Sequence, residues 1–396
     1  MIIPERPSLE RRVLNALEPS AGTPARIPVI LGGCGTGRTS LLLRLRDLIG
    51  RPSCQYIDVE RVATTPERCF ASIRTHSPLP PTHAGSVARE PGARAAFDAT
   101  LAFLDSARAP GGAPATFLLD EFLELRTFES FPGLRAVLRD LIAAIGASGN
   151  RFVLTSRYPT RALRLLREAP SAFEIIHVTP LSPAEIRATL PATADGDGAG
   201  GLREAEADRL HDELARLVHA LSDGRPAYAR LIADTSAALD PHGADPVSAL
   251  SALLGRDGAL DRLCRFSYEL RLHRARGYGA LKAILSVLSE EEPLTLTEIA
   301  VRLARTPGST KDYLSWLEDV DLIVSRQKRY SFADPLLRLW VRLNGRPDPP
   351  ADDDLAREVH AYVLGRLPSA EPALVMAGTH ASVPEREKNW GIIEID

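Results

Sequence analysis

The stretch Gly32-Gly33-Cys34-Gly35-Thr36-Gly37-Arg38-Thr39 decides the fold. It fits the phosphate-loop pattern G-x-x-x-x-G-K-[ST] at every fixed position except the lysine, which is replaced by Arg38. An apolar run at 27–31 precedes it, and residues 39–48 have helical spacing. Glycines let the backbone N–H groups wrap around a phosphate, and a helix N-terminus adds positive potential. The stretch therefore predicts a strand, a phosphate-binding loop and a helix.

Three side chains at the end of this loop are predicted to contact a bound nucleotide. Thr39 would place its hydroxyl on Mg²⁺, and Ser40 is a less favoured neighbour. Arg38 keeps the positive charge of the usual lysine but carries a larger planar fork. It can bind the β- and γ-phosphate oxygens, or it can crowd the γ-phosphate and slow hydrolysis. Because the chain has 44 arginines and only four lysines, general compositional bias also explains the replacement.

An acidic pair, Asp120 and Glu121, ends the apolar strand pattern at 115–119. Asp120 is predicted to hold Mg²⁺, directly or through water, and Glu121 to orient and deprotonate the attacking water. An apolar strand that ends in two acids is common by chance. This one gains weight because it follows the phosphate loop in the chain, with another strand pattern between the loop and the acidic pair. Its position predicts that a further strand lies between the two strands that carry the motifs.

A third motif follows the strand pattern at 152–155, which ends in hydroxyl groups and Arg157. Ligands of open parallel sheets bind at the carboxyl ends of the strands, so all three motifs are expected to face one crevice. Arg157 is then predicted to sense the γ-phosphate. The competing interpretation is an arginine that is simply solvated after a strand.

The order of the elements predicts the fold class. Five apolar runs alternate with helical segments, which predicts an α/β fold with a parallel sheet and helices on both faces; the runs are 27–31, 55–59, 115–119, 152–155 and 174–178. From 181 to about 270 the pattern is helical, with a Gly/Asp/Ala stretch at 192–201 that reads as a flexible loop. Residues 278–343 predict three helices, a hairpin and a last helix.

Composition excludes several classes of protein. The chain has 396 residues and a net charge of −3, so no overall basic field indicates nucleic acid. It has no run of 18 apolar residues and no apolar N-terminal leader, which predicts no membrane contact. The four cysteines have no zinc spacing and are interpreted as reduced thiols of a cytoplasmic protein.

Together the motifs resemble the STAND branch of the AAA+-related P-loop ATPases, which includes archaeal-type ATPases. Thr155-Ser156-Arg157 looks like that group's hydroxyl–hydroxyl–arginine motif, and residues 181–186 look like the start of its helical lid. Ser222-Asp223-Gly224-Arg225-Pro226 is similar to its G-x-P motif, which implies that Pro226 contacts the base of the nucleotide. Residues 331–340 are similar to its "D-P-hydrophobic … W" ending.

The resemblance implies a domain order and a ligand. It implies a P-loop ATPase domain at 1–180, a helical lid at 181–272 and a winged helix at 273–345; residues 346–396 are interpreted as a linker and C-terminal tail. The implied ligands are ATP or ADP with Mg²⁺. Two features depart from the group besides Arg38. Ala333 stands where the M-H-D motif has histidine, and no recognisable effector domain follows the winged helix.

Three functions remain open at this point. The first is an ATP-driven molecular switch with slow hydrolysis, in which Glu121 is the base and Arg38 and Arg157 stabilise charge. The second is a nucleotide sensor or scaffold that does not hydrolyse ATP. Both imply a protein partner or self-association.

The third function is a DNA-associated ATPase that uses its winged helix. The predicted recognition helix region, 310–321, contains one lysine and four acids, which is a poor electrostatic footprint for DNA. The predicted wing carries three basic residues that would suit phosphate: Arg326, Lys328 and Arg329. The recognition helix therefore favours an intramolecular lid or a protein-docking surface over a DNA reader.

Overall fold

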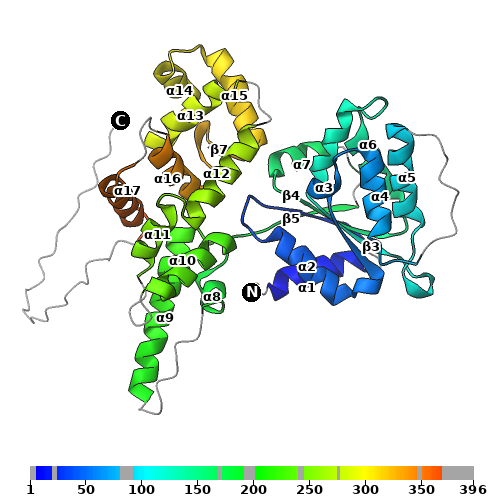
Figure 1. The fold of residues 1–396 in the computed structure, drawn as a ribbon, viewed down its shortest axis with the longest axis horizontal. Coiled ribbons are helices and arrows are strands. Elements are labelled where there is room, and N and C mark those ends of the chain that lie inside the picture. The colour runs from blue at the N-terminus through cyan, green and yellow to red at the C-terminus, as the bar shows by residue number, and fades with distance from the viewer. Residues whose placement is uncertain are drawn as a thin grey trace, which may run out of the picture.

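A five-stranded parallel sheet forms the centre of the N-terminal part of the chain (Figure 1). The computed structural model describes residues 6–19, 25–80, 92–167, 169, 172–190, 201–239, 245–273, 277–345 and 350–367, except for the side chains of 201–205 and 207. The strand order is β2-β3-β4-β1-β5. The strands are β1 Ile27–Leu31, β2 Cys54–Asp58, β3 Thr116–Asp120, β4 Arg151–Ser156 and β5 Phe173–His177. As predicted, another strand, β4, separates the two that carry the phosphate loop and the acidic pair.

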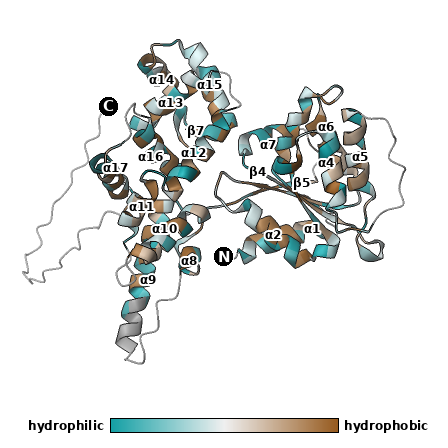
Figure 2. Ribbon diagram, in the orientation of Figure 1, coloured by the Kyte–Doolittle hydropathy of each residue, from teal (hydrophilic) through white to brown (hydrophobic). Residues whose placement is uncertain are grey.

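Helices cover both faces of this sheet because its strands are apolar on both sides. Ile30 and Leu118 point towards α1 (Pro7–Leu17) and α2 (Arg38–Ile49), where they share one buried cluster with Leu42. Val29 and Phe117 belong to the other cluster, with side chains of α5 (Ala93–Ser106) and α6 (Val137–Ala147). In Figure 2 the strands are coloured mostly as hydrophobic.

Several predicted boundaries shift by a few residues, and side-chain caps explain some of the shifts. Val59, predicted as the end of a strand, begins the short helix α3 (Val59–Val62), because Asp58 caps that helix by accepting from Arg61 N at 3.1 Å. The helical segments expected after the third and fourth apolar runs are α6, which begins at Val137, and α7 (Pro159–Leu166). Helix α4 spans Pro66–Thr75, and the 3₁₀ turns are η1 (Arg51–Ser53), η2 (Pro110–Gly112) and η3 (Phe122–Ser130).

A helical unit follows the sheet. It begins with α8 (Pro183–Arg187), where Ser182 and Glu185 form a capping box around a proline at the first helical position. Four longer helices come next: α9 Gly201–Ser222, α10 Pro226–Leu239, α11 Pro246–Leu254 and α12 Ala259–Leu272. The loop predicted at 192–201 lies almost wholly outside the described residues.

A small unit with the element order of a winged helix comes after α12. Its helices are α13 Tyr278–Glu290, α14 Leu296–Arg302, α15 Pro307–Asp319 and α16 Pro335–Asn344. Its antiparallel sheet has the order β6-β8-β7, with β6 Leu294–Thr295, β7 Ile323–Arg326 and β8 Arg329–Phe332. The predicted fold class is therefore confirmed.

One part of the predicted linker is a packed helix instead. Helix α17 (Asp352–Leu364) lies beside α11 and α16 (Figure 1), and Val359 and Val363 are buried there. Three aspartates, Asp352, Asp353 and Asp354, form its first turn, where negative charges are favourable near the helix N-terminus. Tyr362 adds a hydrogen bond from its hydroxyl to Leu221 O at 2.8 Å. Residues 346–349 and 368–396 lie outside the description.

Candidate functional site

The glycine-rich loop curls tightly between β1 and α2. Gly35 and Gly37 have φ angles of +75° and +88°, a region in which other residues are strained, and Gly37 is the N-cap of α2. A Cβ atom on Gly32 would lie 2.8 Å from Thr36 Oγ1. Thr36 closes the loop by donating its hydroxyl to Gly33 O at 2.9 Å. The glycines are thus required by the backbone path itself.

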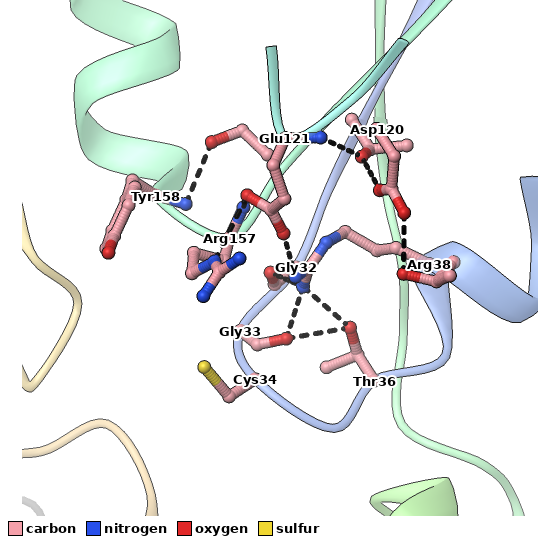
Figure 3. Close-up of polar contacts among 12 residues, drawn as sticks. Gly32, Gly33, Cys34, Thr36, Arg38, Asp120, Glu121, Arg157 and Tyr158 are labelled. Carbon is pink, nitrogen blue, oxygen red and sulfur yellow. Dashed lines mark hydrogen bonds and ion pairs between the residues drawn. The ribbon is translucent and has the colours of Figure 1, made fainter. Parts of the chain in front are cut away.

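Arg38 lies inside the curl of the loop, as Figure 3 shows. Its Nη1 donates to the carbonyl oxygens of Gly32 and Gly33, and it lies 3.1 Å from Thr36 Oγ1. Its Nη2 donates to Glu121 Oε1 at 2.6 Å. The planar fork therefore joins the loop to the acidic strand end, a bridge that depends on two separate nitrogen atoms.

Glu121 is held between two arginines. Its second oxygen accepts from Arg157 N at 2.9 Å and lies 3.2 Å from Arg157 Nε. Burial opposes the charged form, but Arg38 and Arg157 outweigh it and hold the pKa of Glu121 below its usual value. The residue also adopts left-handed backbone, with φ 57°. Glu121 is thus a buried carboxylate whose oxygens already accept fixed hydrogen bonds.

Arg157 is buried, so the interpretation that it is simply a solvated arginine after a strand is wrong. Besides Glu121, it pairs through Nη2 with Glu60 of α3. Burial lowers its pKa, but the charges of Glu121, Cys34 and Glu60 raise it above the ordinary value. Its guanidinium is therefore fixed next to the loop.

Asp120 accepts hydrogen bonds from three hydroxyl groups. Thr39 Oγ1 donates to it at 2.7 Å and Tyr56 OH at 2.9 Å, and Thr155 donates to its other oxygen. Thr155 also accepts from Glu121 N at 3.0 Å, which joins the strand ends of β3 and β4. No motif marks Tyr56, because its position next to Asp120 depends on the register of β2 against β3.

The donor chemistry around Asp120 fits Mg²⁺. A hydroxyl and a carboxylate oxygen are the oxygen ligands that this ion prefers, and it commonly takes its remaining ligands from phosphates and water. Thr39 and Asp120 are the residues that would hold it. Among the described residues there is no cluster of three or more metal-binding side chains, so the protein alone supplies only a partial coordination shell.

The G-x-P segment, residues 222–226, and the start of α10 pack directly on the loop. The N–H of Ala227 donates to Gly35 O at 3.4 Å, and Pro226 Cγ lies 3.7 Å from an ideal Cβ on Gly37. Pro226 and Ser40 line a cavity of about 30 Å³ between α1, α2 and the loop. The predicted contact of Pro226 with a base stays a prediction.

Arg225, the variable residue of the G-x-P segment, joins three parts of the chain. It donates to Cys34 O in the loop at 3.1 Å and to Ala333 O at 2.9 Å, and its Nε lies 3.6 Å from Asp334. Arg271 of α12 makes a second bridge, because it interacts with the Cys34 thiol and donates to Asp321 O at 2.9 Å. Among 44 arginines, no sequence pattern marks these two.

The winged helix also contacts the ATPase-like domain away from the loop. Arg164 of α7 makes two hydrogen bonds to Asp319 at the end of α15, at 2.6 and 3.0 Å. Thr160 and Asp321 lie 3.4 Å apart at the same contact. The acidic end of α15, the helix in the recognition position, is thus docked within the chain. The basic wing residues are exposed: Arg326, Lys328 and Arg329.

Comparison with solved structures shows that the fold is a known architecture. The Walker-type ATPase PABY2304 of Pyrococcus abyssi is similar with a TM-score of 0.59 and 18% sequence identity, over 86% of this chain and 96% of that chain. The chain has the fold of a Walker-type P-loop ATPase. The strand order around the loop and the acidic pair agrees with this.

Two other solved structures match this chain with lower TM-scores. The ORC1 protein of Aeropyrum pernix in complex with DNA has a TM-score of 0.41 and 16% identity, over 87% of this chain and 94% of that one. The STAND protein PH0952 of Pyrococcus horikoshii, with a tetratricopeptide repeat sensor, has a TM-score of 0.29 and 16% identity, over 86% of this chain and 42% of that one. No family model and no curated sequence matches. No helix in the described ranges is long and apolar enough to cross a membrane.

Proposed function

We propose that the chain is an ATP-binding, Mg²⁺-dependent molecular switch that hydrolyses ATP slowly. The observation that carries this proposal is the ion pair between Arg38 and Glu121, 2.6 Å apart within the P-loop ATPase fold. It connects the residue that replaces the usual lysine with the residue expected to act as general base.

The ion pair explains slow turnover in chemical terms. A general base must reach the water that it deprotonates, and its pKa works best near the operating pH. Glu121 has both oxygens engaged and a lowered pKa, so it is a weak base in this arrangement. A γ-phosphate that attracts Arg38 would release one carboxylate oxygen. Arg38 and Arg157 would then stabilise phosphate charge, while Thr39 and Asp120 would hold Mg²⁺.

The switch part of the proposal depends on the contacts of the loop. Arg225 donates one hydrogen bond to Cys34 O in the loop and another to Ala333 O. A shift of the loop on binding phosphate would therefore move Arg225 and weaken its hydrogen bond to the winged helix. The backbone oxygen of Ala333 takes part where the M-H-D pattern would offer a histidine side chain. A protein partner or a second copy of the chain would read the resulting movement.

The first experiment measures the nucleotide that copurifies with the protein and its turnover with Mg²⁺. We expect bound ADP or ATP and a slow release of phosphate that Glu121→Gln abolishes. An unchanged rate in Glu121→Gln would show that Glu121 is not the base. Tight binding of ATP with no turnover in the unmodified protein would support the non-hydrolysing sensor instead.

A DNA-associated ATPase is a second candidate because the basic wing is exposed. Backbone contacts to DNA make binding strongly salt-dependent. The measurement is duplex binding at increasing salt, for the unmodified protein and for a variant with Arg326, Lys328 and Arg329 changed to glutamine. Salt-sensitive binding that the triple variant loses supports this candidate, and its absence removes it.

A further inference from the structure

A cavity outside the phosphate loop lies where the winged helix meets α17. It has a volume of about 430 Å³ and is walled by the end of α13, by α16 and by α17. This volume lies within the range of sites for small molecules. Figure 1 shows α16 and α17 side by side at this place. No element of the P-loop ATPase domain contributes to its lining.

Guanidinium groups outnumber carboxylates in this cavity. Its charged lining residues are Arg338, Arg342 and Arg366 against Glu292 and Glu358. Arg342 Nε pairs with Glu358 at 2.7 Å, and Arg338 Nη1 lies 3.4 Å from Glu292. The carboxylate partner of Arg366 is Asp223, at 3.2 Å, which does not line the cavity.

The arginines retain capacity to bind a ligand. Arg338 Nε is buried and has no hydrogen-bond partner among the described residues. Such a donor costs free energy when it stays unpaired, so it favours a ligand with an acceptor oxygen. Glu292 is a weak competitor, because its Oε2 accepts from Phe332 N at 2.6 Å and because burial raises its pKa.

Arg366 connects the cavity to the lid. It donates to Ala220 O and to Asp223 Oδ1, both at 3.2 Å, at the end of α9. Asp223 belongs to the same short segment as Arg225, which contacts the phosphate loop. An anion that draws Arg366 into the cavity would therefore compete with its hydrogen bond to Asp223 in the G-x-P segment.

We propose that this cavity binds a small phosphorylated molecule, whose phosphate is held by Arg338, Arg342 and Arg366. Three guanidinium forks suit the several oxygens of a phosphate better than the two of a carboxylate. The rest of the lining offers apolar surface for a carbon skeleton, from Pro335, Leu339, Ala361 and Tyr362. The inference does not depend on the proposed function of the phosphate loop.

The test uses pyrophosphate as the probe, titrated by calorimetry into the full chain. We expect two binding sites, one in the loop and one in the cavity. Arg338→Gln and Arg342→Gln should each weaken one site about tenfold or more, because each removes a charge-assisted hydrogen bond. The matched control is Arg357→Gln on α17, which pairs with Asp354 and does not line the cavity.

The outcomes separate the two sites. Arg38→Ala should remove the loop site and keep the cavity site; a cavity site without any loop site would count against the proposed function alone. Wild-type affinity and stoichiometry in both cavity variants would overturn the present inference. Arg342 is partly exposed, so its variant is expected to fold, and unchanged thermal unfolding without pyrophosphate checks this.

Discussion

Arg38 Nη2 lies 2.6 Å from Glu121 Oε1, and these side chains are only 8% and 7% exposed. The two residues come from different motifs, at the start of α2 and directly after β3. Their pairing makes the phosphate loop and the acidic strand end one electrostatic unit, which Arg157 completes on the other side of Glu121. Any ligand phosphate that recruits Arg38 must therefore rearrange the predicted general base.

Arg38→Lys is expected to raise the rate of ATP hydrolysis. A lysine has one compact ammonium group and cannot bridge the loop carbonyls and Glu121 with separate nitrogen atoms. Glu121 would then be freer to accept a proton from water, with an expected gain of about tenfold, within the usual contribution of a general base. The measurement is single-turnover phosphate release, with the exposed Arg51→Lys as control. A rate that stays the same or falls in Arg38→Lys would contradict the ion pair as the brake.

Glu121→Gln is expected to destabilise the protein even without nucleotide. It leaves Arg38 and Arg157 buried with no carboxylate between them, and breaking a buried pair costs about 3–5 kcal/mol. Folding lowers the pKa of Glu121. The charged carboxylate therefore stabilises the fold above the pKa that it has in the unfolded chain, and this stabilisation is lost as pH falls through the pKa of the folded protein.

The check is urea unfolding of both proteins from pH 7 down to pH 3. The stability difference between them should shrink as pH falls below the pKa that the carboxyl has in the unfolded chain. A difference that is constant over this range would show that the charge of Glu121 does not stabilise the fold.

The sequence predicted the sheet, the loop and the acidic strand end because each depends on a local pattern. The apolar runs at 27–31, 115–119 and 152–155 are buried on both faces, and the glycines at 35 and 37 are needed for positive φ angles. The contacts of Arg38 with Glu121, and of Arg225 with Ala333, were not predictable in this way. They join residues far apart in the chain, and arginine is too frequent here for its position to carry information.

Charge reversal at the contact between α7 and α15 is expected to loosen the winged helix without unfolding it. Arg164 is well exposed, so its pair with Asp319 contributes about 1 kcal/mol or less. Arg164→Glu should increase hydrogen exchange in α15 with little change in thermal unfolding. The double variant Arg164→Glu with Asp319→Arg should restore protection. If the double variant exchanges as fast as the single one, the pair does not hold the two elements together.

Asp321→Asn is expected to stabilise the docked winged helix at pH 8 more than at pH 5. Burial raises the pKa of Asp321 to about 7, although Arg271 and Arg161 oppose the shift and Asp319 adds to it. A carboxyl group whose pKa is raised by folding stabilises the folded state fully at pH values below the pKa that it has in the unfolded chain. This stabilisation is lost as pH rises through about 7, the pKa in the folded protein. Asparagine stays neutral throughout and tolerates the φ angle of 52° at this position.

The measurement is thermal unfolding of both proteins between pH 5 and pH 8, with the exposed Asp312→Asn on α15 as control. Equal shifts at both pH values would show that Asp321 does not titrate at this contact.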